Sequence, residues 1–352
     1  MTEKKLPIVE LRGITKLFPG VVANDRVDIK FYPGEVHALL GENGAGKTTL
    51  MNILYGLYPP DAGQILVQGK SRTIHNPNDA LSLGIGMVHQ HFMLVPPFSV
   101  AENIVLGHEP RKNRYFLDME KAIADVEGLS VRYGFQVDPR AKVQDISVGM
   151  QQRVEILKAL YRGAEVLILD EPTAVLTPQE VEELKEITDN LARQGKAIIF
   201  ITHKLQEVMA MSQRITVIRR GRVVGTVATS STDPVELARM MVGRDVVMKL
   251  DKEPAKTGAV VLRMDDVYAE DDRRLPALRG VSLQVKAGEI VGVAGVDGNG
   301  QRELSEVLIG ARPVSRGQIY LKNQDLTNLD VRARKDIGMG HIPEDRQRRG
   351  MI

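Results

Sequence analysis

The run Gly41-Glu42-Asn43-Gly44-Ala45-Gly46-Lys47-Thr48 matches the phosphate-binding pattern G-x-x-x-x-G-K-[ST] at every fixed position. Val36–Leu40 before it reads as a short buried strand, and Thr49–Leu54 after it reads as the start of a helix. In that setting the glycines let successive N–H groups point at one anion, with the positive end of the helix behind them. Lys47 would contact the β- and γ-phosphates, and Thr48 would hold Mg²⁺. The alternative is a chance glycine turn, which the flanking strand and helix disfavour.

A second group of polar residues follows a buried strand farther along the chain. Val166–Leu169 predicts a central strand, and Asp170 and Glu171 stand at its carboxyl end, where α/β sheets place their sites. Asp170 would hold Mg²⁺, directly or through water, and Glu171 would polarise an attacking water. The alternative is a pair of acids on a surface turn, which the phosphate loop upstream disfavours.

Two further side chains stand at strand ends. Gln90 follows the strand expected at Ile85–His89 and would offer an oxygen to Mg²⁺ and position water. His203 follows the strand expected at Ala197–Thr202 and would hydrogen-bond the γ-phosphate or the attacking water. Each signal is weak by itself, because a lone glutamine or histidine is commonly structural. The two gain weight only from the residues described above.

At two other places a binding role and a structural role both stay open. Phe18 lies on a loop before the phosphate loop, where it would either stack on a nucleotide base or belong to the core. Ser147 and Gly149 open a helix, so the hydroxyl and the free N–H groups form either an anion site or an ordinary N-cap.

The remaining pattern alternates between strands and helices, which predicts an α/β fold. Val9–Arg12 and Val27–Phe31 alternate as edge strands do, and residues 91–162 are mostly helical in pattern. Thr177-Pro178-Gln179-Glu180 is a capping box that opens another helix.

Composition excludes several classes of protein. A chain of 352 residues with 43% hydrophobic and 26% charged residues fits two soluble domains. The absence of cysteine excludes disulfides and thiolate metal sites. A net charge of +2, few aromatics and no tryptophan give little support to nucleic-acid binding. No apolar run approaches the roughly 18 residues that would span a bilayer.

Taken together, over roughly the first 228 residues, these motifs resemble the ATP-binding subunit of ABC transporters. The resemblance implies an ABC-type P-loop NTPase with a parallel-sheet core, an antiparallel β subdomain and a helical subdomain, with ATP and Mg²⁺ as cofactors. It also implies the P-loop at Gly41–Thr48, the Q-loop at Gln90, the signature at Ser147–Gln151, the Walker B strand at Val166–Asp170, the catalytic glutamate at Glu171 and the switch histidine at His203.

The expected site falls into three groups. Glu171, His203 and Gln90 are the expected catalytic residues, and Thr48, Gln90 and Asp170 are the expected Mg²⁺ ligands. The expected nucleotide contacts are Phe18, Gly41, Glu42, Asn43, Gly44, Ala45, Gly46, Lys47, Thr48, Thr49, Ser147, Gly149 and Gln151. Two departures from the family pattern stand out. Ile146–Met150 reads I-S-V-G-M instead of L-S-G-G-Q, and Ala174–Thr177 lacks the family's usual aspartate.

The chain also repeats itself. Gln301 and Arg302 replace the Lys and Thr of the P-loop within the second copy's Gly295–Arg302, which predicts a degenerate nucleotide site. Val260–Arg263, Gly288–Val291, Gly317–Ile319 and Ile337–Met339 echo Val9–Arg12, Gly34–His37, Gly63–Ile65 and Ile85–Met87, respectively.

These echoes give the expected domains: a first nucleotide-binding domain at 1–228 with its helical subdomain at about 91–162, a linker at 229–258, and an incomplete second domain at 259–352. A half-built second sheet would expose strand edges and an apolar face, so we expect a fragment of a chain about 500 residues long.

Two fused copies with a degenerate second one resemble the single-chain ATPases of simple-sugar and nucleoside importers. Val148–Lys158 most resembles the nucleoside branch. This resemblance implies transmembrane permease subunits, an extracytoplasmic solute-binding protein as an indirect partner, and a peripheral location on the cytoplasmic face of the membrane. No nucleic-acid partner is expected. A chain ending at Ile352 should bind ATP but hydrolyse it poorly.

Three other classes of protein fit the sequence less well. A soluble tandem ATPase acting on ribosomes or DNA is the main alternative, but it would need a longer basic linker or a coiled coil between the copies. A P-loop GTPase should show N-K-x-D, and Lys322-Asn323-Gln324-Asp325 has the wrong order. A kinase would give no reason for pairing Glu171 with His203.

Overall fold

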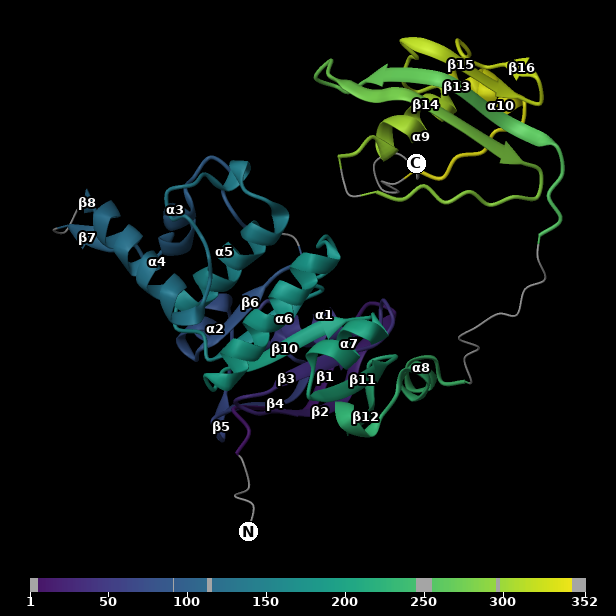
Figure 1. The fold of residues 1–352 in the computed structure, drawn as a ribbon. Helices are drawn as coiled ribbons and strands as arrows, with labels where there is room; N and C mark the ends of the chain where they lie inside the picture. Colours follow the sequence, from purple (N-terminus) through teal and green to yellow (C-terminus); the bar gives the residue numbers. More distant parts are fainter. Residues whose placement is uncertain (1–5, 91, 113–115, 245–254, 296–297, 344–352) are drawn as a thin grey trace. The chain divides into compact units, whose positions relative to one another are not determined.

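The structure is a computed structural model that describes residues 6–90, 92–112, 116–244, 255–295 and 298–343. The chain divides into two compact units, residues 1–248 and residues 249–352 (Figure 1). Among the described residues, no helix combines the length and the apolar character needed to cross a bilayer.

The centre of the first unit is a six-stranded sheet in the order β12-β11-β3-β10-β9-β6. Its strands β3, β9 and β10 are buried at every position because both faces of the sheet are covered, as is typical of parallel sheets. β12 alone runs antiparallel, at one edge. The strands are β3 (Val36–Leu40), β6 (Ile85–Val88), β9 (Val166–Asp170), β10 (Ala197–Thr202), β11 (Arg214–Arg219) and β12 (Arg222–Ala228).

One face of this sheet packs against a second, antiparallel sheet with the strand order β2-β1-β4-β5 and against two helices. Alternate residues of the strands, such as Leu11, Ile29 and Ile168, meet in this core. The second layer consists of β1 (Val9–Phe18), β2 (Val21–Phe31), β4 (Ala62–Val67), β5 (Lys70–Arg72), α1 (Lys47–Leu54) and α2 (Pro77–Ser82).

The opposite face of the central sheet is covered by helices, with Leu40, Leu169 and Phe200 in the shared core. α3, α4 and α5 gather at one end of the unit, with the short β7–β8 ribbon beyond them (Figure 1). These elements are α3 (Val100–Val105), β7 (Arg111–Lys112), β8 (Phe116–Leu117), α4 (Met119–Tyr133), α5 (Val148–Tyr161), α6 (Pro178–Arg193) and α7 (Leu205–Met211). The expected fold class, with a parallel-sheet core, an antiparallel β subdomain and a helical subdomain, is confirmed.

The first unit extends past the expected boundary at residue 228. Helix α8 (Pro234–Val242) begins at the N-cap Asp233 and buries Leu237 and Met241 in the same core as the central sheet. The part of the expected linker that precedes residue 244 therefore contains a helix that belongs to the first unit.

The second unit contains an antiparallel sheet with the order β14-β13-β15-β16, which repeats the order β2-β1-β4-β5. The segment 289–295 carries no strand, and Ile290 there is 92% exposed. Val296 and Asp297 of the expected second loop lie outside the described residues, as do residues 344–352. The elements are β13 (Val260–Glu270), β14 (Pro276–Lys286), α9 (Gln301–Ile309), β15 (Arg316–Leu321), β16 (Gln324–Asp325) and α10 (Val331–Asp336).

One of the expected sequence matches between the two units, Ile337–Met339 with Ile85–Met87, differs from the match of their structures. Gly338 follows α10 with a positive φ of 96° and donates its N–H to Lys335, as Gly84 follows α2 with φ of 77° and donates to Leu81. Gly338 therefore corresponds to Gly84, and the expected match with Gly86 is two residues out of register. The sequence misled because both stretches read Ile-Gly-Met.

Among the described residues of the second unit, Arg334 is the largest fully buried side chain. All of the hydrogen bonds that the structure gives it go to backbone carbonyl oxygens. Its guanidinium donates to the carbonyls of Leu329 (2.9 Å), Val307 (2.7 Å) and Leu326 (2.6 Å), and also to Leu308 and Thr327. One cation thus joins the end of α9, the loop after β16 and helix α10.

Candidate active site

The phosphate loop joins β3 to α1, as its sequence predicts. Lys47, only 5% exposed, donates from Nζ to the carbonyl oxygens of Gly41 (2.7 Å) and Glu42 (3.0 Å). Around this anchored lysine, the loop residues Glu42, Asn43 and Gly44 are exposed, as is Thr48 in the first turn of α1, while Thr49 is half-buried. The loop therefore leaves an open surface above a buried ammonium group.

Gly46 shows why this loop requires glycine. Its φ of 101° is left-handed, and a Cβ there would overlap Ala23 O and lie 2.9 Å from Asn24 Nδ2. Asn24 is fully buried on β2 and donates to Gly46 O at 3.1 Å. Asn24 was not predicted from the sequence. A polar residue within an otherwise alternating strand was the available signal.

Two carboxylates, those of Asp170 and Glu171, lie near the ammonium group of Lys47. Burial lowers the pKa of Lys47, and the carboxylates of Glu171 and Asp170 act against this by raising it. The pKa of Asp170 is raised, first by burial and also by Glu171, while a hydrogen bond with Thr48 and the charge of Lys47 lower it. The lysine, the threonine and both acids are thus close enough to interact, although they come from three separate parts of the chain.

Glu171 is the meeting point of the other two expected catalytic residues. Gln90 donates from Nε2 to Glu171 Oε2 at 3.3 Å, and His203 Nδ1 lies 2.8 Å from Glu171 Oε1. Glu171 has a left-handed φ of 45°, uncommon for a residue with a side chain, and its N–H donates to Ile201 O at 3.0 Å. Such local strain is often found at functional sites.

The strand order explains why these residues meet. β10 lies between β3 and β9, and β6 pairs with the far side of β9, all in parallel. The carboxyl ends of four strands therefore point the same way, and each is followed by one of the expected residues. Gly41 follows β3, Gln90 follows β6, Glu171 follows β9 and His203 follows β10.

Glu207 on α7 joins two of these strand ends and was not predicted from the sequence. Its Oε2 accepts hydrogen bonds from Thr173 (2.6 Å) and Thr202 (3.1 Å). Thr173 lies two residues after Glu171, and Thr202 directly precedes His203. The same carboxylate pairs with Lys204. Glu207 thereby fixes the distance between the two loops, and no sequence motif marks it.

The remaining expected contacts lie elsewhere. Phe18 does not lie on a loop, as expected, but ends β1, and at 38% exposure it is not part of the core. Its ring stands edge-on to Tyr58, with centroids 5.6 Å apart, and Lys16 Nζ lies 5.7 Å from its centroid. Ser147 N-caps α5 and accepts from Met150 N–H at 3.2 Å, and Gln151 donates to the carbonyls of Val143 and Ile146. Gly149 lies against α6. The structure does not bring these residues into contact with the P-loop of the same unit.

The donor set at the site suits Mg²⁺. Mg²⁺ prefers one or two carboxylates together with phosphate oxygens and water, not a cage of protein ligands. Asp170 beside Thr48 supplies such a partial set, and burial of the carboxylate against Glu171 leaves an excess of negative charge that a cation would relieve. Among the described residues, no group of three or more His, Cys, Asp or Glu forms a self-sufficient metal cluster.

Comparison with known proteins agrees with this geometry. Residues 24–174 match the ABC transporter family profile. The guanosine import ATP-binding protein NupO of Bacillus subtilis is 54% identical over 345 residues, which cover 98% of this chain and 68% of that protein. The nucleoside import ATP-binding protein NupA of Lactococcus lactis is 52% identical over the same shares. A nucleotide-free ATP-binding cassette of an ABC transporter superposes with a TM-score of 0.59 at 22% identity, covering 68% of this chain and 96% of that one.

Proposed function

The chain belongs to the ATP-binding subunits of ABC transporters, which are ATPases, and we propose that it hydrolyses ATP to power import of a nucleoside or simple sugar through membrane permease subunits. The observation that carries the hydrolytic part is the contact of Gln90 and His203 with Glu171, beside a buried Lys47. The similarity to guanosine and nucleoside import proteins supports a nucleoside as cargo.

Each residue has a part in the proposed reaction. Lys47 and the N–H groups of the loop bind the phosphates, and the fixed ammonium offsets the charge that grows on them as the bond to the γ-phosphorus breaks. Glu171 accepts a hydrogen bond from the attacking water and orients it. His203 and Gln90 hold the Glu171 carboxylate in place, and His203 would also hydrogen-bond the γ-phosphate.

Mg²⁺, when bound with ATP, would be held by Thr48 and Asp170, with Gln90 as a further oxygen donor, and would neutralise phosphate charge. The residues themselves supply the rest: an anchored cation, a water-orienting carboxylate and two side chains that hold this carboxylate.

The second unit is proposed to be a degenerate nucleotide-binding copy. Gln301 stands at the start of α9 as Lys47 does at the start of α1, and Gly300 caps α9 with φ of 97°, close to the 101° of Gly46. Arg302, in place of Thr48, pairs with Glu306 at 3.0 Å. Arginine has no hydroxyl group that could bind a cation, as Thr48 would in the first unit. In a complete transporter we propose one hydrolytic and one degenerate site.

The proposed location is the cytoplasmic face of the membrane, where the protein would bind permease subunits peripherally and act with a solute-binding protein on the other side. The helical subdomain, which in the family docks on transmembrane partners, is the proposed contact. Copurification with membrane proteins, as opposed to ribosomes or DNA, would separate this assignment from that of a soluble tandem ATPase.

Glu171→Gln is the decisive test of the hydrolytic site. The amide retains the shape of the side chain but loses the negative charge that orients water, so ATP turnover should fall at least about 100-fold, within the range for a catalytic base. Binding of ATP, followed by fluorescence titration, should remain. Glu165→Gln, which changes a surface acid paired with Lys196, is the matched control and should turn over normally. Turnover that survives in Glu171→Gln would remove Glu171 from its role.

A further inference from the structure

The side chain of Glu180 on α6 lies so close to Gly149 on α5 that it occupies the space of a Cβ there. A Cβ on Gly149 would overlap Glu180 Oε1 and lie 2.7 Å from Glu180 Cδ. Gly149 has no left-handed φ, since it lies in the first turn of α5. Glycine is thus required at this position for space and not for backbone conformation.

The Glu180 carboxylate is held in place from its own side. Its Oε2 accepts from Thr177 N–H at 2.9 Å and from Thr177 Oγ1 at 3.0 Å, which completes the capping box that opens α6. Glu180 therefore cannot swing away from Gly149 without breaking the cap of its own helix.

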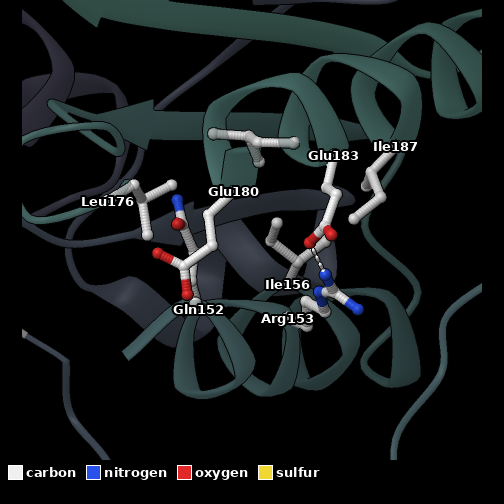
Figure 2. A pocket seen from close by; sticks show the side chains of 9 residues that line it. Gln152, Arg153, Ile156, Leu176, Glu180, Glu183 and Ile187 are labelled. Atoms are coloured by element: carbon white, nitrogen blue, oxygen red, sulfur yellow. Dashed lines mark hydrogen bonds and ion pairs between the residues drawn. The ribbon is translucent and has the colours of Figure 1, made fainter. Parts of the chain in front are cut away.

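The neighbouring contacts make this a closed interface between helices. Figure 2 shows Glu180 and Glu183 pointing from α6 toward Gln152 and Arg153 of α5, with Arg153 paired to Glu183. The cavity between the two helices has a volume of about 10 Å³, comparable to one water molecule, so it leaves no room for an organic ligand. The two acidic side chains thus serve to fix α5 against α6.

This interface joins two parts of the proposed ATPase. Ser147 is the N-cap of α5, and Ser147–Gln151 is the stretch that resembles the family's signature, while α6 follows the loop that starts at Glu171. We propose that Glu180 is a positioning residue that sets the first turn of α5, and that Gly149 is glycine because this carboxylate occupies the space of a side chain. The inference rests on the proposed function and on the expectation that Ser147, Gly149 and Gln151 contact nucleotide.

A double-mutant cycle in urea unfolding tests the contact. Gly149→Ala alone should lower the ratio of folded to unfolded chain by about fivefold, the usual effect of losing a helix cap. In a Glu180→Ala background the same change should raise this ratio, because alanine favours helix over glycine once the carboxylate is gone. Glu183→Ala, one turn along the same face, should not reverse the effect. Additive changes would overturn the proposed contact.

ATP turnover tests the positioning role. Glu180→Ala should lower kcat by about 10- to 100-fold with little change in KM, because a misplaced signature acts after binding. Glu180→Gln should keep most of the rate, since glutamine also completes a capping box. Gly149→Ala alone should be slower than Glu180→Ala, because its methyl group meets the carboxylate. The double variant Gly149→Ala/Glu180→Ala lacks that carboxylate and should return to the rate of Glu180→Ala. A double variant as slow as Gly149→Ala alone, or equal rates for Glu180→Ala and wild type, would refute the role.

The two levels of the proposal fail differently. If the protein is not an ATPase of the proposed kind, Glu171→Gln will retain turnover, but the unfolding cycle will still show coupling between Gly149 and Glu180. If the positioning role alone is wrong, Glu171→Gln will stop turnover, but Glu180→Ala will turn over ATP as fast as wild type.

Discussion

Lys47 shows how much of the site depends on one buried charge. Its ammonium is fixed by two backbone carbonyls and is drawn toward Asp170 and Glu171, so it is already placed before any phosphate arrives. Lys47→Ala should raise the Kd for ATP by about 100-fold, equivalent to a loss of about 3 kcal/mol, because a preorganised cation is missing. Calorimetric titration measures this directly. Gln301→Ala in the second unit is the control, and an equal loss there would contradict the assignment of the intact loop.

Asp170 makes stability depend on pH. Because its pKa in the folded chain lies above the ordinary value, its contribution is fully present below the ordinary aspartate range and is lost as the pH rises through the raised pKa. Asp170→Asn is neutral at every pH and should therefore be more stable than wild type above this window, without nucleotide. Below the window the two should converge. Urea unfolding across this range checks the sign, and a variant less stable at neutral pH would contradict it.

At the scale of elements, the start of α1 depends on the close approach of β2. Gly44 and Gly46 both have positive φ, but a Cβ on Gly44 meets nothing within 4 Å, whereas one on Gly46 meets Ala23 and Asn24. Gly44→Ala should thus cost about 1 kcal/mol of backbone strain. Gly46→Ala should cost about 1–3 kcal/mol more, from crowding. The difference between the two in the free energy of unfolding isolates the contact, and equal costs would mean that β2 yields freely.

Much of the element pattern could be predicted from the sequence. The strands Val36–Leu40 and Ala197–Thr202 agree with β3 and β10, because a short apolar run between turn residues has few alternatives. The strand expected at Val9–Arg12 was predicted too short, since it extends to Phe18 as β1. Its expected position at an edge was wrong, because β1 lies between β2 and β4. Polar residues such as Lys16 interrupt the alternation there, and pairing with β2 and β4 maintains the strand despite them.

The site was only partly predictable. The motifs place Lys47 and Glu171 at strand ends, but the order of strands that makes those ends neighbours is not written in any local pattern. Asn24 and Glu207 were missed because their importance comes from contacts with residues distant in sequence, which no spacing reveals. The sequence predicts Gly149 as a nucleotide contact and Glu180 as part of a capping box, but no local pattern predicts that this carboxylate faces Gly149.

At the scale of the whole chain, α8 determines where the first unit ends. Leu237 is fully buried beneath the central sheet, while Val235 on the same helix is 56% exposed. Leu237→Ala should lower the free energy of unfolding of the first unit by about 2–5 kcal/mol. Val235→Ala should change it by less than about 0.5 kcal/mol. Unfolding monitored within residues 1–248 measures both, and a small effect at Leu237 would place α8 outside the unit.

The hydrogen bonds of the buried Arg334 should depend little on salt concentration and pH. Its five acceptors are peptide oxygens, which do not titrate, and the guanidinium itself stays charged at any accessible acidity. Dissolved ions screen exposed charge pairs, such as Arg316 with Asp266, far more than a cation sealed among neutral dipoles. High salt or low pH should therefore weaken exposed ion pairs of this unit, such as Arg316 with Asp266, while the hydrogen bonds of the buried Arg334 persist.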